Sequence, residues 1–273
     1  MLSQRIVTAL LLLPPVLALI WFAPTAWLFV VVGAAGLAVA WEWTALMGGL
    51  PRARRVGYLA LTAVLLVLSW QFLYPRERWP WVMAAAALWW LVACALLAGF
   101  PENFTRHPPG KRILGVVGQF LLVPTILGIA VLHAMPDGRE RLLYTLMLVW
   151  VADTGAYFAG RAFGRHKLAP TISPGKSWEG AVGALAFCAL WAVTAGAYVF
   201  GVHGPALATL VALSLVVVGW SIVGDLTESM FKRRVGLKDS GNVLPGHGGV
   251  LDRVDSLLAA VPLMALGLHV TGL

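Results

Sequence analysis

Four acidic residues mark the two ends of a polar segment, Ser229–Asp255, that lies between two long apolar runs. Asp225 and Glu228 come just before it, three residues apart, and Asp252 and Asp255 end it with the same spacing. Residues three apart share one face of a helix, so each pair can point in one direction. If both apolar runs reach the same membrane surface, the two acidic faces can meet there. Carboxylates that converge in this way suit Mg²⁺, which binds through one or two carboxylates together with substrate phosphates.

The predicted cation ligands are therefore Asp225, Asp252 and Asp255, and Asp225 and Asp252 are also predicted to be catalytic. Helix capping is the alternative for Asp252 and Asp255, because acidic side chains near a helix N-terminus complement its dipole without a metal. Capping leaves the many basic residues and glycines of the same segment unexplained, so a metal site is favoured.

Those basic residues and glycines have the chemistry needed to hold phosphate groups. Glycines let backbone N–H groups approach phosphate oxygens, and Lys and Arg stabilise charge on a phosphoryl group in transfer. A basic loop that only follows membrane topology is the alternative. We predict charge stabilisation by Lys232, Arg233, Lys238 and Arg253, and substrate contacts by Asp239, His247, Gly248 and Gly249.

A second polar loop, Ser173–Gly180, contains a Gly-Lys-Ser sequence. It is not a phosphate-binding P-loop, because Pro170 stands where that motif needs Gly and no strand is expected before it. The loop could still supply polar side chains to a phosphate, and the predicted substrate-binding residues are Ser173, Lys176, Ser177 and Glu179.

Two further acidic residues, Asp153 and Glu42, fall inside apolar runs. Placing a carboxylate at membrane depth costs about 2.5–3.5 kcal/mol on an insertion scale, so such a group usually faces a polar cavity or a charged partner. Asp153 is predicted to contact substrate, with an ion pair to Arg161 as the structural alternative. For Glu42, a functional role and a structural role at the end of its apolar run stay equally open.

The composition indicates a membrane protein. Of 273 residues, 60% are hydrophobic and 12% are charged, and the mean hydropathy is +0.83. Soluble domains carry about a quarter charged residues. We expect an all-α, polytopic integral membrane protein with about nine transmembrane helices, forming one domain, 1–273. The first five spans lie in 1–135, and the catalytic spans lie in 136–273, with cytoplasmic loops 162–180 and 225–253. The predicted spans are Ile6–Phe22, Trp27–Met47, Val56–Leu73, Trp81–Gly99, Ile113–His133, Leu142–Ala162, Ala181–Phe200, Ala206–Gly224 and Val254–Leu273.

The basic residues predict the orientation of these spans. Sixteen Lys and Arg fall on the N-terminal side of the membrane and only Arg76, Arg78, Arg139 and Arg141 fall on the other. By the positive-inside rule the N-terminus and both polar loops are cytoplasmic, and the C-terminus lies outside. The net charge of +8 does not indicate nucleic-acid binding, because the basic residues sit beside spans, where topology and anionic headgroups already explain them.

The polar segment resembles the signature of the bacterial phosphatidate cytidylyltransferase, or CDP-diacylglycerol synthase, family. The Ser173–Gly180 loop and the apolar run around Asp153 are also similar to that family, whereas the first five spans resemble it only in composition. The matching positions are Ser229, Phe231, Lys232, Arg233, Lys238, Asp239, Gly241, Leu244, Pro245, His247, Gly248, Gly249, Asp252, Arg253 and Asp255.

This resemblance implies an enzyme that converts CTP and phosphatidate into CDP-diacylglycerol and pyrophosphate. It implies Mg²⁺ dependence, with K⁺ as a candidate second cation, at the aspartates that match Asp225 and Asp252. It also implies a homodimer in the bacterial cytoplasmic (inner) membrane, with the active site facing the cytoplasm. The alternatives are a CTP-dependent polyprenol or phytol kinase, an ion-coupled transporter that uses Asp153 and Glu42, and an inactive scaffold.

Overall fold

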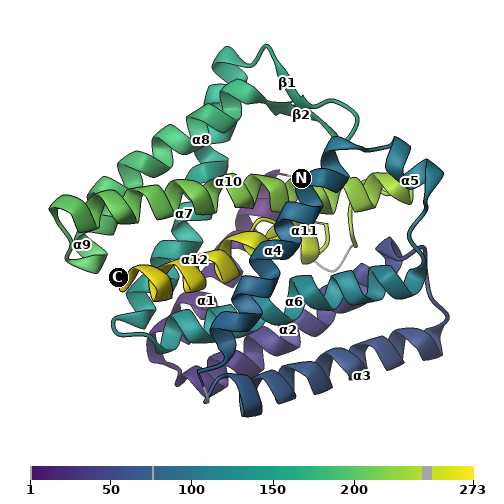
Figure 1. The fold of residues 1–273 in the computed structure, drawn as a ribbon, viewed down its shortest axis with the longest axis horizontal. Helices are drawn as coiled ribbons and strands as arrows, with labels where there is room; N and C mark the ends of the chain where they lie inside the picture. Colours follow the sequence, from purple (N-terminus) through teal and green to yellow (C-terminus); the bar gives the residue numbers. More distant parts are fainter. Residues whose placement is uncertain (1, 76, 242–247) are drawn as a thin grey trace.

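The computed structural model describes residues 2–75, 77–241 and 248–273, and the side chains of all of these except 2–10 and 12. The chain is almost entirely helical, as expected (Figure 1). The α-helices are α1 Leu2–Phe22, α2 Thr25–Leu46, α3 Arg52–Leu68, α4 Trp79–Ala98, α5 Glu102–Arg106, α6 Lys111–Ala134, α7 Gly138–Phe163, α8 Trp178–Trp191, α9 Ala197–Phe200, α10 Gly204–Arg234, α11 Leu251–Val254 and α12 Leu257–Thr271. Two π-helical segments, η1 Ser69–Leu73 and η2 Ala192–Gly196, continue α3 and α8.

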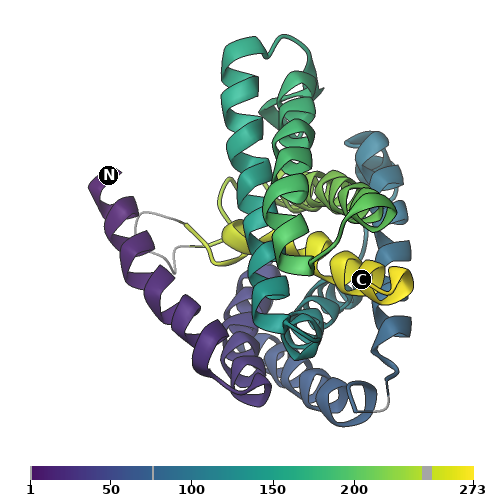
Figure 2. The same cartoon turned by 90° about the vertical axis from the view of Figure 1, so that its left-hand side faces the viewer.

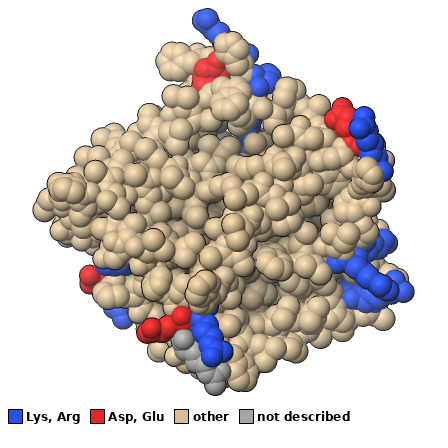
Figure 3. All heavy atoms as spheres, in the orientation of Figure 1, with Lys and Arg blue, Asp and Glu red and all other residues tan. Residues whose placement is uncertain are grey.

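The helices confirm a polytopic membrane protein. Within the described residues, eight helices are long and apolar enough to cross a membrane, and a shorter apolar helix, Leu13–Phe22, lies where the first span is predicted. Large apolar side chains such as Trp27 and Trp81 are exposed on the protein surface. Figure 3 shows that charged residues lie at the margins of one face while its centre carries none, as a surface in contact with acyl chains requires.

Helix α12 lies inside the bundle, where it packs against α4, α6, α7 and α10. Figures 1 and 2 show α10 crossing the molecule beside α12, and α7 and α8 running together as a pair. Helices α10 and α12 approach closely at Gly224, where an added Cβ would lie 2.8 Å from the backbone oxygen of Asp255. This close approach places the residue after Gly224, Asp225, next to the start of α12.

Helix α10 is longer than the sequence predicted. The expected span ends at Gly224, but the helix continues to Arg234 and contains 31 residues, which is about 46 Å at the helical rise. The hydrocarbon core of a bilayer is only about 30 Å thick. The continuation has no helix-breaking residue, and it buries Leu226, Met230 and Phe231 against the rest of the protein. Residues 225–234 are therefore part of a rigid helix and not of a loop.

A short β-hairpin connects α7 to α8. Strands β1 (Lys167–Ala169) and β2 (Ser173–Ser177) pair antiparallel, with Lys167 opposite Ser177 and Ala169 opposite Ser173. The sequence predicted only a polar loop here, because strands this short and this polar have no recognisable alternation of apolar residues. The hairpin matters for the site because it fixes the direction of the Ser173–Gly180 side chains.

Candidate active site

A cavity of about 370 Å³ opens between α7, β2, α8 and α10. Its polar lining combines Asp153 from α7, Lys176 from β2 and Asp225 from α10, and the Lys176 ammonium forms an ion pair with the Asp225 carboxylate. Arg161 also lines the cavity, and it donates a hydrogen bond of 2.9 Å to the Tyr157 hydroxyl. Three elements that are distant in the sequence thus bring predicted site residues to one place.

Asp255 lies next to this cavity. Its carboxylate accepts a hydrogen bond of 2.6 Å from the backbone N–H of Ser256, and Ser256 lines the cavity. The close approach of the helices at Gly224 explains this arrangement, because it brings the start of α12 against α10.

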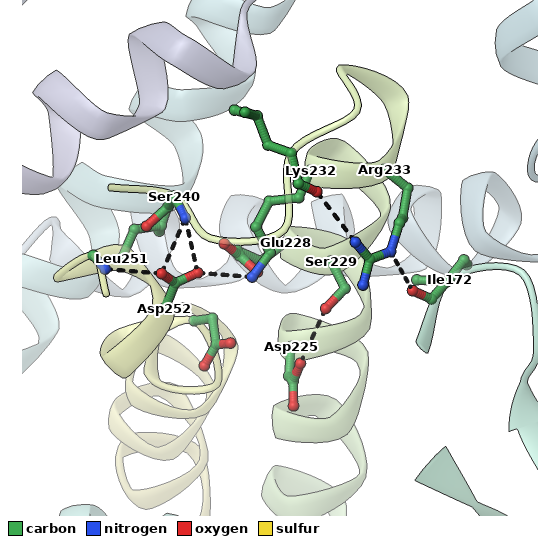
Figure 4. A network of polar contacts seen from close by, with 12 residues as sticks. Ile172, Asp225, Glu228, Ser229, Lys232, Arg233, Ser240, Leu251 and Asp252 are labelled. Atoms are coloured by element: carbon green, nitrogen blue, oxygen red, sulfur yellow. Dashed lines mark hydrogen bonds and ion pairs between the residues drawn. The ribbon is translucent and has the colours of Figure 1, made fainter. Parts of the chain in front are cut away.

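A second polar cluster lies one to two turns further along α10, and Figure 4 shows it from close by. The Lys232 ammonium lies 2.7 Å from a Glu228 oxygen and 2.7 Å from an Asp252 oxygen, and all three side chains are largely buried. Acidic residues of α10 and α11 therefore do approach each other, as the sequence predicted. The contact runs through Lys232, which pairs with both Glu228 and Asp252.

Asp252 also binds backbone groups of the polar segment on both sides of residues 242–247. Besides Lys232, its carboxylate accepts hydrogen bonds from the backbone N–H of Ser240, at 3.0 and 3.2 Å, and from that of Gly249, at 2.9 Å. Both of its oxygens are engaged in these contacts. The role of Asp252 as a cation ligand stays a prediction, and the observed bonds give its carboxylate a structural task.

Two of the predicted residues in and after the hairpin have structural partners. The Ser177 hydroxyl caps α8 by accepting a hydrogen bond of 3.2 Å from the N–H of Gly180. Glu179 accepts bonds from the His166 ring, at 2.6 Å, and from the His166 backbone. Ser173 is half-buried at the start of β2. Nothing in the sequence pattern indicated that His166 would pair with Glu179.

Arg233 ties the end of α10 to the hairpin. Its guanidinium donates hydrogen bonds to the backbone oxygens of Ile172, at 3.1 Å, and Leu237, at 3.2 Å. The sequence predicted that Arg233 stabilises charge on the substrate phosphates. In the structure its guanidinium connects α10 to the hairpin and to the residues that follow α10.

The remaining predicted residues lie on or beside the polar segment. Lys238, Asp239 and Arg253 are exposed. Gly248 has a φ of 81°, which favours glycine, and Gly249 is buried. His247 lies outside the described residues.

Glu42 is the residue whose importance the sequence left undecided. It is 3% exposed, and its carboxylate accepts hydrogen bonds from the Ser240 hydroxyl and from the backbone N–H groups of Val250 and Leu251. The available signal was a carboxylate inside an apolar run. Its partners, 198 to 209 residues away along the chain, could not be foreseen.

The donor set fits a magnesium ion that is shared with a substrate. Within residues 2–75, 77–241 and 248–273, no group of three or more His, Cys, Asp and Glu side chains is arranged to enclose a metal. Mg²⁺ does not need such an enclosure, because it retains waters and binds through one or two carboxylates plus phosphates. Asp153, Asp225 and Asp255 supply hard oxygen donors, and Lys176 and Arg161 supply positive charge for the phosphates.

The fold and this site are those of a membrane-embedded protein that can bind phosphates, and comparison with known proteins identifies it as a nucleotidyltransferase and gives its family. The chain belongs to the Cytidylyltransferase family, whose model matches residues 3–271. The resemblance drawn from the polar segment is therefore confirmed, and it extends over the first five spans as well.

Three relatives match this chain along almost their whole length. A phosphatidate cytidylyltransferase of Pseudomonas aeruginosa is 44% identical over 272 residues, which cover 100% of this chain and 98% of that protein. One of Haemophilus influenzae is 36% identical over 288 residues, covering 96% of each chain. One of Brucella suis is 37% identical over 274 residues, covering 97% of this chain and 92% of the relative.

Proposed function

We propose that this protein transfers the cytidylyl group of CTP to phosphatidate, producing CDP-diacylglycerol and pyrophosphate. The observation that carries this proposal is the cavity in which Asp153, Lys176 and Asp225 converge next to apolar wall residues. The names of the full-length relatives support the same substrates.

The cavity suits a substrate that is polar at one end and apolar at the other. Next to the charged groups, its walls carry Ala156, Leu168, Ala181 and Ala184. A phosphatidate headgroup could approach Lys176 while its acyl chains stay in the bilayer, and CTP could enter from the cytoplasm. This arrangement supports an active site at the cytoplasmic face of the bacterial inner membrane. A homodimer is part of the same proposal, by similarity to the family.

In the proposed reaction, a phosphate oxygen of phosphatidate attacks the α-phosphorus of CTP in line. The new P–O bond forms as the bond between the α-phosphorus and the bridging oxygen breaks, and pyrophosphate leaves with those electrons. The attacking phosphate is already ionised, so no side chain has to remove a proton. Catalysis then consists mainly of positioning and charge stabilisation. Lys176 and Arg161 are placed to hold phosphates in the cavity. Of the other predicted cations, Lys238 and Arg253 are exposed and we keep them as candidates for charge stabilisation, whereas Lys232 and Arg233 position the segments around the site.

Mg²⁺, with K⁺ as a candidate second ion, would neutralise charge on the phosphates when bound. Of the three predicted ligands, we favour Asp225 and Asp255. Asp225 lines the cavity, and Asp255 directly precedes Ser256, which also lines it. Asp252 instead lies in the second polar cluster, where it accepts hydrogen bonds from Lys232, Ser240 and Gly249.

Labelled CTP tests the reaction directly. Purified protein in detergent, given phosphatidate, Mg²⁺ and CTP labelled at the α-phosphorus, should place the label on the lipid and release unlabelled pyrophosphate. A lipid kinase would release labelled CDP instead, and a transporter or scaffold would leave CTP intact; either result overturns the proposal.

The matched variants are Asp225→Asn, in the cavity, and Glu102→Gln, an exposed carboxylate at the start of α5. Asp225→Asn should abolish label transfer and Glu102→Gln should retain it. Full turnover by Asp225→Asn would remove that residue from the reaction.

A further inference from the structure

Glu42 of α2 makes an unusual set of contacts for a carboxylate inside a membrane bundle. Its Oε2 accepts hydrogen bonds of 3.1 Å from the Ser240 hydroxyl and 2.8 Å from the N–H of Leu251, and its Oε1 accepts one of 3.0 Å from the N–H of Val250. The side chain is 3% exposed. A buried carboxylate is costly unless it is hydrogen-bonded, so three donors converging on Glu42 indicate a specific task.

The donors come from two places in the chain between α10 and α11. Ser240 lies six residues after the end of α10, and Val250 and Leu251 form the start of α11. The same two places are held by a second carboxylate, because Asp252 accepts from the N–H groups of Ser240 and Gly249. Ser240 therefore bonds both carboxylates, its hydroxyl to Glu42 and its N–H to Asp252.

The backbone at Gly241 and Gly249 packs closely against the Glu42 carboxylate. A Cβ added at Gly241 would lie 2.6 Å from the Glu42 Oε1, and one added at Gly249 would lie 2.7 Å from its Oε2. The two glycines let the backbone close around the carboxylate. The Glu42 carboxylate is thus enclosed by residues 240–241 and 249–251.

We propose that Glu42 is a positioning residue that holds Ser240 and the start of α11 together and so fixes the orientation of Asp252. The carboxylate reaches the segment from the N-terminal half of the chain, which the sequence had not connected with the site. The effect on turnover rests on the proposed function; the effect on the backbone does not.

The physical basis is the number of acceptor sites. A carboxylate has two oxygens, each able to accept more than one hydrogen bond, and an amide has only one oxygen. In Glu42→Gln the oxygen can still serve Val250 or Leu251, but the amide nitrogen faces an N–H group that then has no acceptor. A buried donor without an acceptor loses its bond and also keeps the cost of its desolvation, so the end of the segment should open more often.

The experiment compares Glu42→Gln with Thr44→Val. Thr44 is also buried on α2, and its hydroxyl donates to the Trp41 oxygen within the same helix. Both variants are purified in one detergent and studied by hydrogen–deuterium exchange and by steady-state kinetics. We expect amide exchange in peptides covering 248–252 to become roughly five- to tenfold faster in Glu42→Gln, the effect of about one lost hydrogen bond. Thr44→Val should exchange as the wild type does.

The kinetic readout separates positioning from general damage. Glu42→Gln should lower kcat by about 10- to 100-fold, the range typical of residues that orient a site from outside, with little change in the KM for CTP. Ser240→Ala removes one of the three donors and keeps the carboxylate, so it should give a smaller loss with the same exchange pattern. If Glu42→Gln fails to fold, the same exchange and kinetic measurements on Ser240→Ala test the proposal. Combining the two changes should cost less than the sum of their effects, because they remove the same contact.

Two outcomes overturn the proposal. In the first, peptides covering 248–252 exchange at the wild-type rate in both Glu42→Gln and Ser240→Ala. In the second, exchange is faster but kcat is unchanged or falls only as far as in Thr44→Val. If the wild-type protein itself shows no cytidylyl transfer, the proposed function fails, and the exchange data alone then decide whether Glu42 holds the segment.

Discussion

Replacing Lys232 with methionine should destabilise the protein strongly. The ammonium lies 2.7 Å from both Glu228 and Asp252, and the exposed fractions of the three side chains are 10%, 1% and 9%. With an effective dielectric constant of about 20, each attraction amounts to roughly 6 kcal/mol before desolvation is subtracted. Removing one partner of a buried pair typically costs about 3–5 kcal/mol, because the charge left behind is uncompensated.

The loss should appear as a lower unfolding temperature in detergent. For a chain of this size each kcal/mol corresponds to roughly 2–4 °C, so Lys232→Met should lower Tm by about 6–20 °C. Lys238→Met is the matched control, because Lys238 is an exposed lysine in the same segment. Its effect should stay within about 0.5 kcal/mol, as surface substitutions usually do.

The double variant Lys232→Met with Glu228→Gln identifies the cause. Changing Glu228 removes one of the two negative charges that Lys232 compensates, so the double variant should be more stable than Lys232→Met alone by about 1 kcal/mol or more. The electrostatic reasoning is wrong if Lys232→Met unfolds at the wild-type temperature, or if the added Glu228→Gln lowers Tm further.

Three further results are expected. Lys176→Met should raise the KM for phosphatidate about tenfold or more, because the headgroup phosphate loses the ammonium that now pairs with Asp225; an unchanged KM for phosphatidate, measured by pyrophosphate release, would contradict this. Gly224→Ala should cost about 1–3 kcal/mol in thermal unfolding, since its Cβ would lie 2.8 Å from the Asp255 oxygen and α10 must shift; wild-type stability would show that the contact yields freely. Removing divalent cations with a chelator should stop label transfer, and Mg²⁺ should restore it where K⁺ alone does not; activity that survives chelation would argue against the proposed cation.

Much of the fold could be predicted because its cause is local in the sequence. Long apolar runs predict spans whatever they pack against. The spacing of Asp225 with Glu228, and of Asp252 with Asp255, indicated two acidic faces that could approach each other. The resemblance of the polar segment then gave the family, and the comparisons confirm it.

The details that the sequence did not give depend on partners far along the chain. The end of α10 is helical because Met230 and Phe231 are buried among residues of α2, α4 and α6, and no local pattern shows this. The role of Glu42 follows from donors about 200 residues away. The ion pair that joins β2 to α10 through Lys176 requires a hairpin too short to be recognised.

The length of α10 links the polar site to the bilayer itself. Asp225, Lys232 and Arg233 lie on one uninterrupted helix, so the distances between their backbone positions are fixed before any substrate binds. A helix whose apolar stretch does not match the surrounding hydrocarbon adapts by tilting. A tilt of α10 would move all three groups together with respect to the headgroup layer, so we expect turnover in reconstituted vesicles to vary with acyl-chain length even when the headgroup stays the same.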